Sequence, residues 1–385
     1  MYLKTKQDII DQLAKFDVVN YAKTRNFVGG GVSEISPYIT HGVISTAECV
    51  EVILQHRNIQ ESEKFLMELV WKEFFLYVQK STWNWFLTTP IREDKTKITK
   101  KEILSKSVYM WKTETQRVNK TINTLVDTWL LHNHKRMWLA SRCCHWAKLD
   151  WKKLADWTYF HFLDWELSSN HLSRQRVNST FANKAYFMNE ENLKKYRSWT
   201  SDEDIRWTYE VIFDKLFDQN RKSLYREEND YYQDLKTQTQ NIKKRENKSI
   251  SKTWWHIYIL SPRKLSDDIF SRTGEHIIVL DTKFTEDHPR SQKRLSFVQS
   301  YADFYKIDFV IWNYQEIIET YIQAWYKVSL DERRDSVYKE TQKMYIKNAS
   351  VSILPYWWIY IENKNETILK FFKYWNKVKK HLKNT

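Results

Sequence analysis

The scarcity of glycine and proline limits what this chain can fold into. Each occurs only five times among 385 residues, and four of the five glycines lie between Gly29 and Gly42. Average usage is about 7% for glycine and about 5% for proline, and both residues interrupt helices. The sequence therefore predicts a mainly helical protein with one unusual turn. The chain also exceeds the roughly 150 residues of a common domain, so we expect two domains.

Helical periodicity dominates the first half of the chain. Apolar residues recur at helical spacing over residues 43–200, as in SEKFLMELVWKEFFLYVQ, which predicts long helices packed on one another. The polar stretch LKTQTQNIKKRENKSISK contains no aromatic residue and is typical of a linker. The sequence thus predicts a helical domain over 1–234, a linker over 235–252 and a smaller domain over 253–385.

The smaller domain has the character of an α/β fold. Its β-type runs are WWHIYIL (254–260), HIIVLD (276–281) and DFVIWNY (308–314), and the helical run QKRLSFVQSYADFY separates the second from the third. Strands that alternate with helices predict a parallel sheet with crossover connections. SILPYWWIYIE (352–362) is a fourth candidate strand, and the basic tail FFKYWNKVKKHLKN is interpreted as a solvated amphipathic helix.

The charge balance favours a polyanionic partner. Lysine and arginine outnumber aspartate and glutamate by 62 to 48, which gives a formal net charge of +14. Such an excess suits DNA or RNA, although an AT-rich genome, which encodes lysine freely, explains it equally well. The basic stretch at 92–107 is either a solvated loop or a DNA-facing segment.

Cysteine usage and hydropathy favour an intracellular protein. Cys49, Cys143 and Cys144 cannot build a disulfide framework, and no Cys/His spacing is typical of a metal site. The N-terminus has the pattern of an amphipathic helix rather than a signal peptide, and no segment reaches the ~18 apolar residues of a membrane span. We expect a cytoplasmic monomer that binds neither metal nor membrane.

Two motifs suit the binding of charged groups, and each also has a structural interpretation. The glycine turn before Ser33 and Ser36 precedes a predicted helix, whose backbone N–H groups can hold a phosphate or serve only as an ordinary N-cap. HNHKRM (132–137) gathers hydrogen-bond donors and places Asn133 and Met137 on one helix face. It is alternatively a polar helix cap or a helix end that faces nucleic acid.

A third motif, LDWELSSNH, places acids in a turn bounded by tryptophan. Asp164 and Glu166 need a cation or N–H donors if they are buried, and Arg136 is the nearest candidate by residue type. On composition alone, a structural salt bridge explains this motif better than a functional site does.

The order of these motifs resembles the photolyase/cryptochrome family of flavoproteins. That family carries a Thr-Ser-Arg-Leu-Ser-Pro-Tyr phosphate loop, a Glu-Leu-x-Trp-Arg-Glu-Phe helix, His-Asn-x-x-Arg-Met, and Asp-x-Asp-x-x-x-Asn ahead of Trp-Gln-Trp. The segments that resemble them are, in the same order, VSEISPY (32–38), ELVWKEF (68–74), HNHKRM (132–137), DWELSSN (164–170) and RQR (174–176). The resemblance covers about residues 20–200. It implies a mainly α fold, in which a helical FAD-binding domain precedes a smaller, antenna-like α/β domain, the reverse of the family's order.

The resemblance implies FAD as the cofactor and leaves the antenna chromophore unspecified. Arg136 and Asp164 match the family's ion pair beside the isoalloxazine, and Asn170 matches the residue that faces flavin N5. Lys72 stands where the family has arginine. The residues that would contact FAD are Tyr21, Ser33, Ile35, Ser36, Lys72, Asn133, Arg136, Asp164, Glu166 and Asn170.

The resemblance also implies DNA, either a damaged duplex or a single strand, as the partner. Repairing members flip a pyrimidine dimer into a pocket, where excited, reduced FAD injects an electron that splits the cyclobutane ring. The residues expected to be catalytic are Glu68, Trp71, Asn133, Met137 and Asn170.

The chain departs from the family pattern at the phosphate loop and at the electron-transfer tryptophans. Glu34 replaces the loop arginine, and Arg174 and Arg176 replace the two tryptophans of Trp-Gln-Trp. Trp151 matches the middle member of the usual electron-hopping chain. Arginines at 174 and 176 can instead stack on bases or bind phosphates, so both are predicted DNA contacts.

These departures leave three hypotheses. The first is an FAD-binding, DNA-associated protein with light-driven dimer repair. The second is a cryptochrome-like blue-light sensor without repair, and the third is a flavin-free relic that binds nucleic acid. Arg174 and Arg176 favour the second and third hypotheses, whereas Glu68 and Trp71 favour the first.

Overall fold

The structure is a computed structural model of the whole chain. It describes residues 3–94, 99–100, 102–104, 106–109, 116–164, 166–182, 186–196, 208–217, 230–240, 255–332, 336–356, 358–359 and 370–384. The chain folds into two compact units. The first unit comprises residues 1–18, 33–84 and 238–385, and the second comprises 19–32 and 85–237. The domain boundaries expected at 234 and 253 stay predictions.

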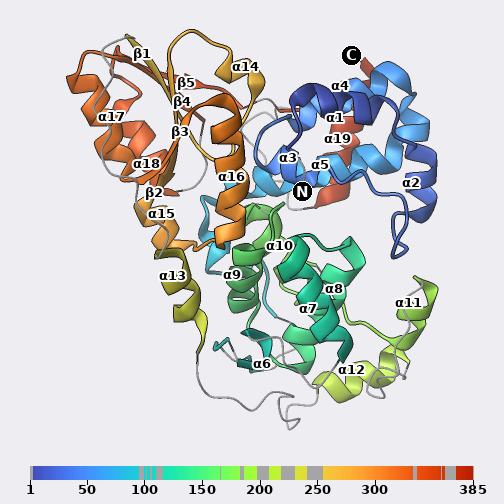
Figure 1. Ribbon diagram of the computed structural model, residues 1–385. Helices are drawn as coiled ribbons and strands as arrows, with labels where there is room; N and C mark the ends of the chain where they lie inside the picture. Colours follow the sequence, from blue (N-terminus) through green and yellow to red (C-terminus); the bar gives the residue numbers. More distant parts are fainter. Residues whose placement is uncertain are drawn as a thin grey trace. The chain divides into compact units, whose positions relative to one another are not determined.

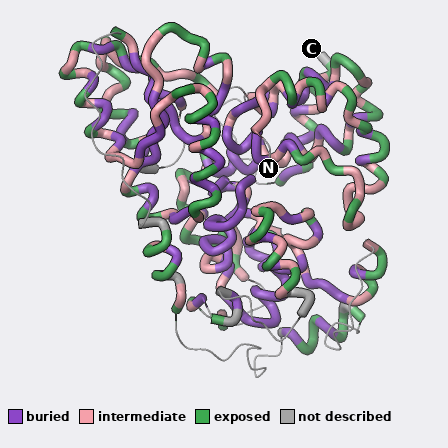
Figure 2. Tube along the Cα trace, in the orientation of Figure 1, coloured by how far each residue is buried: buried purple, intermediate pink, exposed green. Residues whose placement is uncertain are grey.

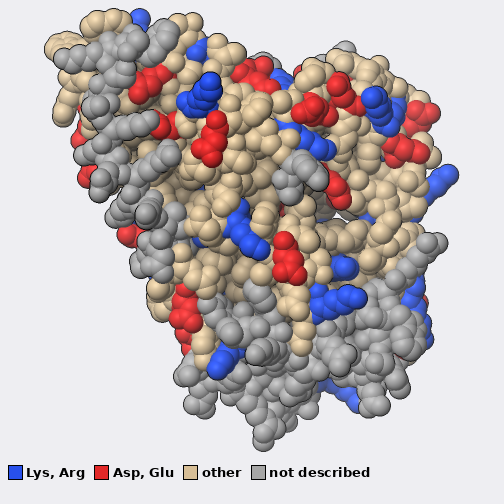
Figure 3. All heavy atoms as spheres, in the orientation of Figure 1, with Lys and Arg blue, Asp and Glu red and all other residues tan. Residues whose placement is uncertain are grey.

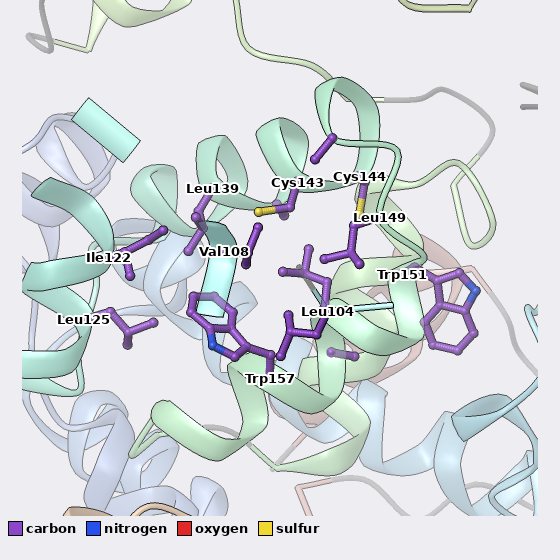
Figure 4. Close-up of a cluster of buried hydrophobic side chains, with 14 of the residues drawn as sticks. Leu104, Val108, Ile122, Leu125, Leu139, Cys143, Cys144, Leu149, Trp151 and Trp157 are labelled. Carbon is purple, nitrogen blue, oxygen red and sulfur yellow. The ribbon is translucent and has the colours of Figure 1, made fainter. Parts of the chain in front are cut away.

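The second unit is helical (Figure 1). Its elements are α2 (Val18–Thr24), η1 (Trp85–Leu87), α6 (Lys106–Tyr109), α7 (Gln116–Thr128), α8 (Asn133–Ser141), the π-helical turn η2 (Arg142–Trp146), α9 (Trp151–His161), α10 (Leu167–Val177), α11 (Glu190–Lys195), α12 (Tyr209–Phe217) and α13 (Tyr232–Gln240). Leucines from several helices pack with the two adjacent cysteines and with Trp151 and Trp157 (Figure 4). This core explains why both cysteines are buried, free thiols: burial raises the pKa of Cys143 and Cys144 well above its ordinary value.

Five helices of the first unit lie outside its sheet region, and three of them, α1, α4 and α5, begin with a side-chain cap. The five are α1 (Lys6–Ala14), α3 (Ser36–Thr40), α4 (Thr46–His56), α5 (Ile59–Thr82) and α19 (Phe371–Asn384). Thr5 and Ser45 form capping boxes with Asp8 and Glu48, which satisfy backbone N–H groups that a helix start leaves unpaired. Among the described residues, no helix is long and apolar enough to cross a membrane.

The C-terminal helix α19 packs one face on α5. Phe371, Tyr374, Trp375 and Val378 are buried and recur at the i, i+3, i+4, i+7 spacing of one helix face. Lys379 Nζ lies 2.6 Å from Glu63 Oε1 at the edge of this contact. The tail is therefore the amphipathic helix that the sequence predicts, but its apolar face is covered rather than solvated.

The first unit also holds a five-stranded parallel sheet in the order β3-β2-β1-β4-β5. Its elements are β1 (His256–Leu260), α14 (Asp267–Phe270), β2 (Glu275–Asp281), α15 (Thr282–Asp287), α16 (Gln292–Tyr305), β3 (Asp308–Trp312), α17 (Tyr314–Gln323), β4 (Lys327–Asp331), α18 (Ser336–Tyr345) and β5 (Val351–Leu354). Helices α14 and α16 lie on one face and α17 and α18 on the other (Figure 1). The three inner strands β1, β2 and β4 are buried along most of their length, which explains the apolar run in HIIVLD (Figure 2). The strand order changes direction between β1 and β4, as in doubly wound α/β sheets.

The fold class predicted from sequence is confirmed: the protein is mainly helical and ends in a parallel α/β sheet. The first three predicted strands correspond to β1, β2 and β3, and the helix between the second and third is α16. The fourth corresponds to β5, which stops at Leu354 because Pro355 cannot continue a ladder. No sequence pattern had indicated β4, since KVSLD has only two apolar residues. Residues 241–252 of the predicted linker lie outside the described residues, and 235–240 belong to α13.

Candidate functional site

A buried, bidentate ion pair joins Arg136 on α8 to Asp164 in the turn before α10. Arg136 Nη1 lies 3.0 Å from Asp164 Oδ1, and Nη2 lies 2.7 Å from Oδ2. Arg136 Nε donates to the carbonyl oxygen of Leu131, and the guanidinium lies 4.4 Å from the centroid of the Phe162 ring. Two parallel N–H···O bonds fix the orientation of both groups. The pairing that the sequence predicts is therefore formed, and its role toward a cofactor stays a prediction.

Asn170, one turn into α10, is directed at α9. Its side chain is fully buried, its Oδ1 accepts from Thr158 Oγ1 at 2.9 Å, and its Nδ2 donates to the carbonyl oxygen of Ala155 at 2.6 Å. Such bonds satisfy a buried amide. Glu166 N-caps the same helix and is also buried. In this structure Asn170 thus contributes to the packing of two helices.

The two arginines that replace the family's tryptophans differ in exposure. Arg176 is exposed, whereas Arg174 is 2% exposed and its Nη1 donates to the carbonyl oxygen of Arg136 at 3.2 Å. Burial lowers the pKa of Arg174 to about 9, and the nearby Arg136 adds to this effect. Arg176 is therefore exposed enough to contact DNA directly, whereas Arg174 would have to leave the core to do so.

Trp151 borders a buried carboxylate that the sequence reasoning missed. Asp156 Oδ2 lies 2.7 Å from Lys152 Nζ, and its Oδ1 lies 3.3 Å from His171 Nε2. The ring of Trp151 meets that of His171 edge-on at 6.2 Å. Burial alone would raise the pKa of Asp156, but His171 and Lys152 hold it below its ordinary value. The i, i+4 spacing of Lys152 and Asp156 was the one local signal in the sequence.

The glycine turn and the start of α8 also belong to the second unit. Tyr21 lies on α2 and is nearly buried, and a Cβ on Gly30 would sit 2.0 Å from the carbonyl oxygen of Thr24, so the turn needs glycine there. Asn133 is exposed and Met137 is half-buried. The ring of His134 lies 4.1 Å from that of Tyr196 at an angle of 37°, and burial lowers the pKa of His134 to about 4.

The remaining predicted phosphate-binding residues belong to the first unit. α3 has only five residues, and its N-cap residue, Ile35, forms no side-chain cap bond. Ser33 and Ser36 are half-buried, and Glu34 is exposed with a φ of 54°. Lys72 Nζ donates to Thr40 Oγ1 at 2.6 Å. Lys72 is therefore anchored to α3, and the carboxylate of Glu34 is solvated.

Trp71, a predicted substrate contact on α5, stacks on a residue of the C-terminal helix. The rings of Trp71 and Phe371 are 3.7 Å apart and nearly parallel, at 7°. Beneath them the buried carboxylate of Glu73 accepts from the Ile359 N–H at 2.7 Å and from the Tyr374 hydroxyl at 2.8 Å. Glu68, on the same helix, is half-buried. One face of Trp71 is thus occupied by the chain itself.

The carboxyl edge of the sheet carries a further polar network that no motif had indicated. Asp331, at the end of β4, accepts from Ser261 N at 2.8 Å and from Ser261 Oγ at 2.6 Å across the point where the strand order reverses. Asp281, at the end of β2, accepts from the backbone N–H groups of Phe284 and Tyr314. Both carboxylates therefore bond to the segments that leave neighbouring strands at this edge.

Fold and site together define a protein with two parts, a helical unit built around a buried arginine–carboxylate pair and a doubly wound parallel sheet. No family model matches the chain. The DASH cryptochrome of Ostreococcus tauri, described as chloroplastic/mitochondrial, is 25% identical over 162 residues, which are 40% of this chain and 29% of that protein. The chain is therefore a distant relative of the photolyase/cryptochrome family, and it spans less than a third of the curated relative.

Solved structures give weaker similarities. A cryptochrome of Synechocystis sp. PCC6803 has a TM-score of 0.44 at 18% identity, over 51% of this chain and 44% of that one. An archaeal photolyase of Sulfolobus tokodaii, described with two FAD molecules, has a TM-score of 0.43 at 18% identity, over 51% and 45% of the two chains. A class III photolyase of Agrobacterium tumefaciens has a TM-score of 0.39 at 21% identity, over 50% and 42%.

Proposed function

We propose that the chain is an FAD-binding, DNA-associated flavoprotein of the photolyase/cryptochrome kind. The observation that carries this proposal is the buried Arg136–Asp164 pair, which occupies the family positions expected beside the isoalloxazine. The pair retains slight exposure, with 11% of the Arg136 side chain and 6% of the Asp164 side chain accessible. A guanidinium held in this way can present a fixed donor and a positive charge to an anionic ring system.

The residues of the second unit fit the flavin in one respect and differ in another. The ion pair is held by two parallel N–H···O bonds and by the carbonyl oxygen of Leu131, so the chain itself fixes its orientation. Asn170, in contrast, uses both polar groups of its amide to bind α9. If Asn170 faces flavin N5, the second N–H of its Nδ2 would have to make that contact while the first stays bonded to α9. When bound and reduced, FAD would supply the electron that splits a pyrimidine dimer.

The chain's own residues would govern how that electron is replaced. Arg174 stands where the family has the flavin-proximal tryptophan, and a guanidinium cannot relay an electron hole. Trp151 is present, but its ring contacts His171 rather than another tryptophan among the described residues. We therefore propose slow photoreduction along the usual route.

DNA association is proposed on charge and on two exposed side chains. Asn133 and Arg176 are exposed in the second unit. Acidic and basic side chains are interspersed on the face shown in Figure 3, so the net charge of +14 is not gathered there into one patch. Contacts to phosphate by Arg176 would weaken with salt, as counterion release requires.

Flavin binding is tested by purifying the full chain and recording its absorption spectrum before and after FAD is added. We expect a flavin spectrum, and we expect Asp164→Asn to lower the FAD occupancy at least tenfold. The matched control is Glu190→Gln, which removes an exposed pair with Lys194 and should leave occupancy unchanged. A colourless protein whose spectrum ignores added FAD overturns the proposal.

Repair is tested separately, with thymine-dimer DNA and chemically reduced flavin, which bypasses photoreduction. Restored thymine supports the repairing form, and a flavin-loaded protein that restores none supports a sensor. Arg174→Trp should then speed photoreduction. An unchanged rate would show that the electron takes another route.

One observation favours a second candidate, a flavin-free nucleic-acid-binding protein. Asn170 is fully buried and bonds two residues of α9, as in a permanently packed core. Such a protein would bind labelled DNA with the same affinity whether FAD is present or absent. Location in the cytosol stays a prediction.

A further inference from the structure

The amino-terminal edge of the parallel sheet exposes an unusual number of large apolar side chains. Twelve large apolar side chains are exposed among the described residues, and five of them lie at this edge: Trp255 (73% exposed), Phe304 (54%), Trp325 (85%), Met344 (62%) and Ile346 (65%). Each lies just before a strand or at the end of the helix that leads into one. We call these five residues the rim. Exposed apolar side chains gathered on one edge indicate a binding surface more than scattered ones do.

The two tryptophans of the rim lie on neighbouring strands. Trp255 precedes β1 and Trp325 precedes β4, which is the parallel partner of β1. The Lys327 N–H donates to the carbonyl oxygen of Trp255 at 2.8 Å, which fixes the two strand starts beside each other. Strands in a sheet are about 4.8 Å apart, so two indole rings at this edge can engage consecutive groups of one ligand.

Trp325 is held outward at a conformational cost. Its φ is 67°, in the left-handed region that is unfavourable for a bulky residue. A ring that is 85% exposed gains little from folding. This conformation caps α17: the Trp325 N–H donates to the carbonyl oxygen of Ile322 and the Tyr326 N–H to that of Tyr321, both at 3.0 Å, so the helix end fixes where the exposed ring lies.

Basic side chains alternate with the apolar ones along the rim. Arg272 precedes β2, Lys306 precedes β3, Lys327 opens β4 and Lys347 precedes β5, and all four are exposed. Burial lowers the pKa of His256, and Lys327 and Arg272 add to this. Of the nearby acids, Glu275 and Asp308 are half-buried, and Glu275 accepts from the Tyr321 hydroxyl.

We propose that the rim binds single-stranded nucleic acid, with Trp255 and Trp325 stacking on bases and the neighbouring lysines and arginine on phosphates. Aromatic faces interleaved with cations match a chain that alternates bases and phosphates. A single strand fits because a duplex encloses its base faces. The proposal is independent of flavin binding.

Fluorescence anisotropy of the full chain with a labelled oligothymidylate of about 16 nucleotides tests it. Trp255→Ala and Trp325→Gly should each raise the Kd by roughly five- to a hundred-fold. Lys327→Gln should reduce the slope of log Kd against log salt by about 0.7. The matched control is Phe372→Ala, which removes a ring that is 65% exposed on α19 in the same unit and should leave the Kd unchanged.

Three results would overturn the proposal. The first is an unchanged Kd in the double variant of both tryptophans, with its fold verified by circular dichroism. The second is an equal loss of duplex and single-strand binding, which would exclude stacking. The third is a change of sedimentation coefficient in the tryptophan variants without a change in Kd, which would assign the rim to protein contacts. If the purified protein is colourless and the tryptophan variants still lose oligonucleotide binding, the flavin proposal fails while this proposal stands.

Discussion

The region around α8, α9 and α10 and the rim of the sheet arrange polar and aromatic groups in opposite ways. In the helical region, the carboxylates of Asp164 and Asp156 are buried, and the Arg136 side chain is 11% exposed. On the rim, aromatic groups such as Trp255 and Trp325 stand in solvent between cations. Buried charges are stable only with partners, and here each of the three has one.

This difference separates two kinds of functional signal. Removing a partner in the helical region should destabilise the protein, so a change in binding there also reflects a change in stability. Removing a rim side chain should leave the fold intact, because the ring contributes little to burial. The rim is therefore the better place to test function by mutation, and the helical region the better place to test structure.

The largest expected effect is on the ion pair. Asp164→Asn removes the negative charge and leaves the Arg136 guanidinium buried without its counter-charge, so the free energy of unfolding should fall by about 3–5 kcal/mol. Equilibrium urea denaturation measures it. Glu190→Gln, at an exposed i, i+4 pair, should change stability by about 0.5 kcal/mol at most. Equal effects of the two variants would contradict the contrast between buried and exposed groups.

A buried carboxylate in the first unit should behave in the same way on a smaller scale. Tyr374→Phe removes the hydroxyl that Glu73 accepts, without opening a cavity, and should lower stability by about 1.5–3 kcal/mol because the acceptor is charged. Phe372→Ala, on the exposed side of α19, serves as the control in the same urea titration. If Tyr374→Phe leaves the free energy of unfolding unchanged, the bond to Glu73 does not stabilise the packing of α19.

His134 should make the helical region sensitive to acid. Burial lowers its pKa from 6.5 to about 4, so the unfolded state binds a proton before the folded state does. Stability is then complete above about pH 6.5 and falls as the pH drops toward 4, by about 1–2 kcal/mol after allowance for its partial burial. Free energies of unfolding measured across this range should be flatter for His134→Gln. If the free energy of unfolding falls equally with pH in both proteins, His134 is not the cause of the acid sensitivity.

The smallest effect should have the opposite sign. Trp325→Gly relieves the left-handed backbone and deletes a solvent-exposed ring, so the free energy of unfolding should stay constant or rise by up to about 1 kcal/mol. Thermal denaturation compares it with the unchanged chain. A loss of more than about 1 kcal/mol would show that the ring is part of the fold, and the contrast between the two regions would fail.

Local patterns account for the parts of the protein that could be predicted. The strands β1, β2 and β3 are apolar runs bounded by polar residues, and α16 and α19 have helical periodicity. Each can therefore be predicted from a short stretch of sequence. The pairing of Arg136 with Asp164 followed from the need of a buried acid for a cation, together with the family resemblance. The strand β4 had neither signal and was missed, because its place in the sheet comes from its neighbours β1 and β5.

The sequence by itself determined the fold class, the order of the motifs and the distant family relationship, because these depend on residue type and spacing along the chain. Only the tertiary structure decided that Asn170 binds α9, that Arg174 is buried while Arg176 is exposed, and that Phe371 covers Trp71. The same holds for the rim, which collects residues from separate connections of the sheet. Burial and the meeting of distant segments arise from packing in three dimensions, which no local pattern specifies.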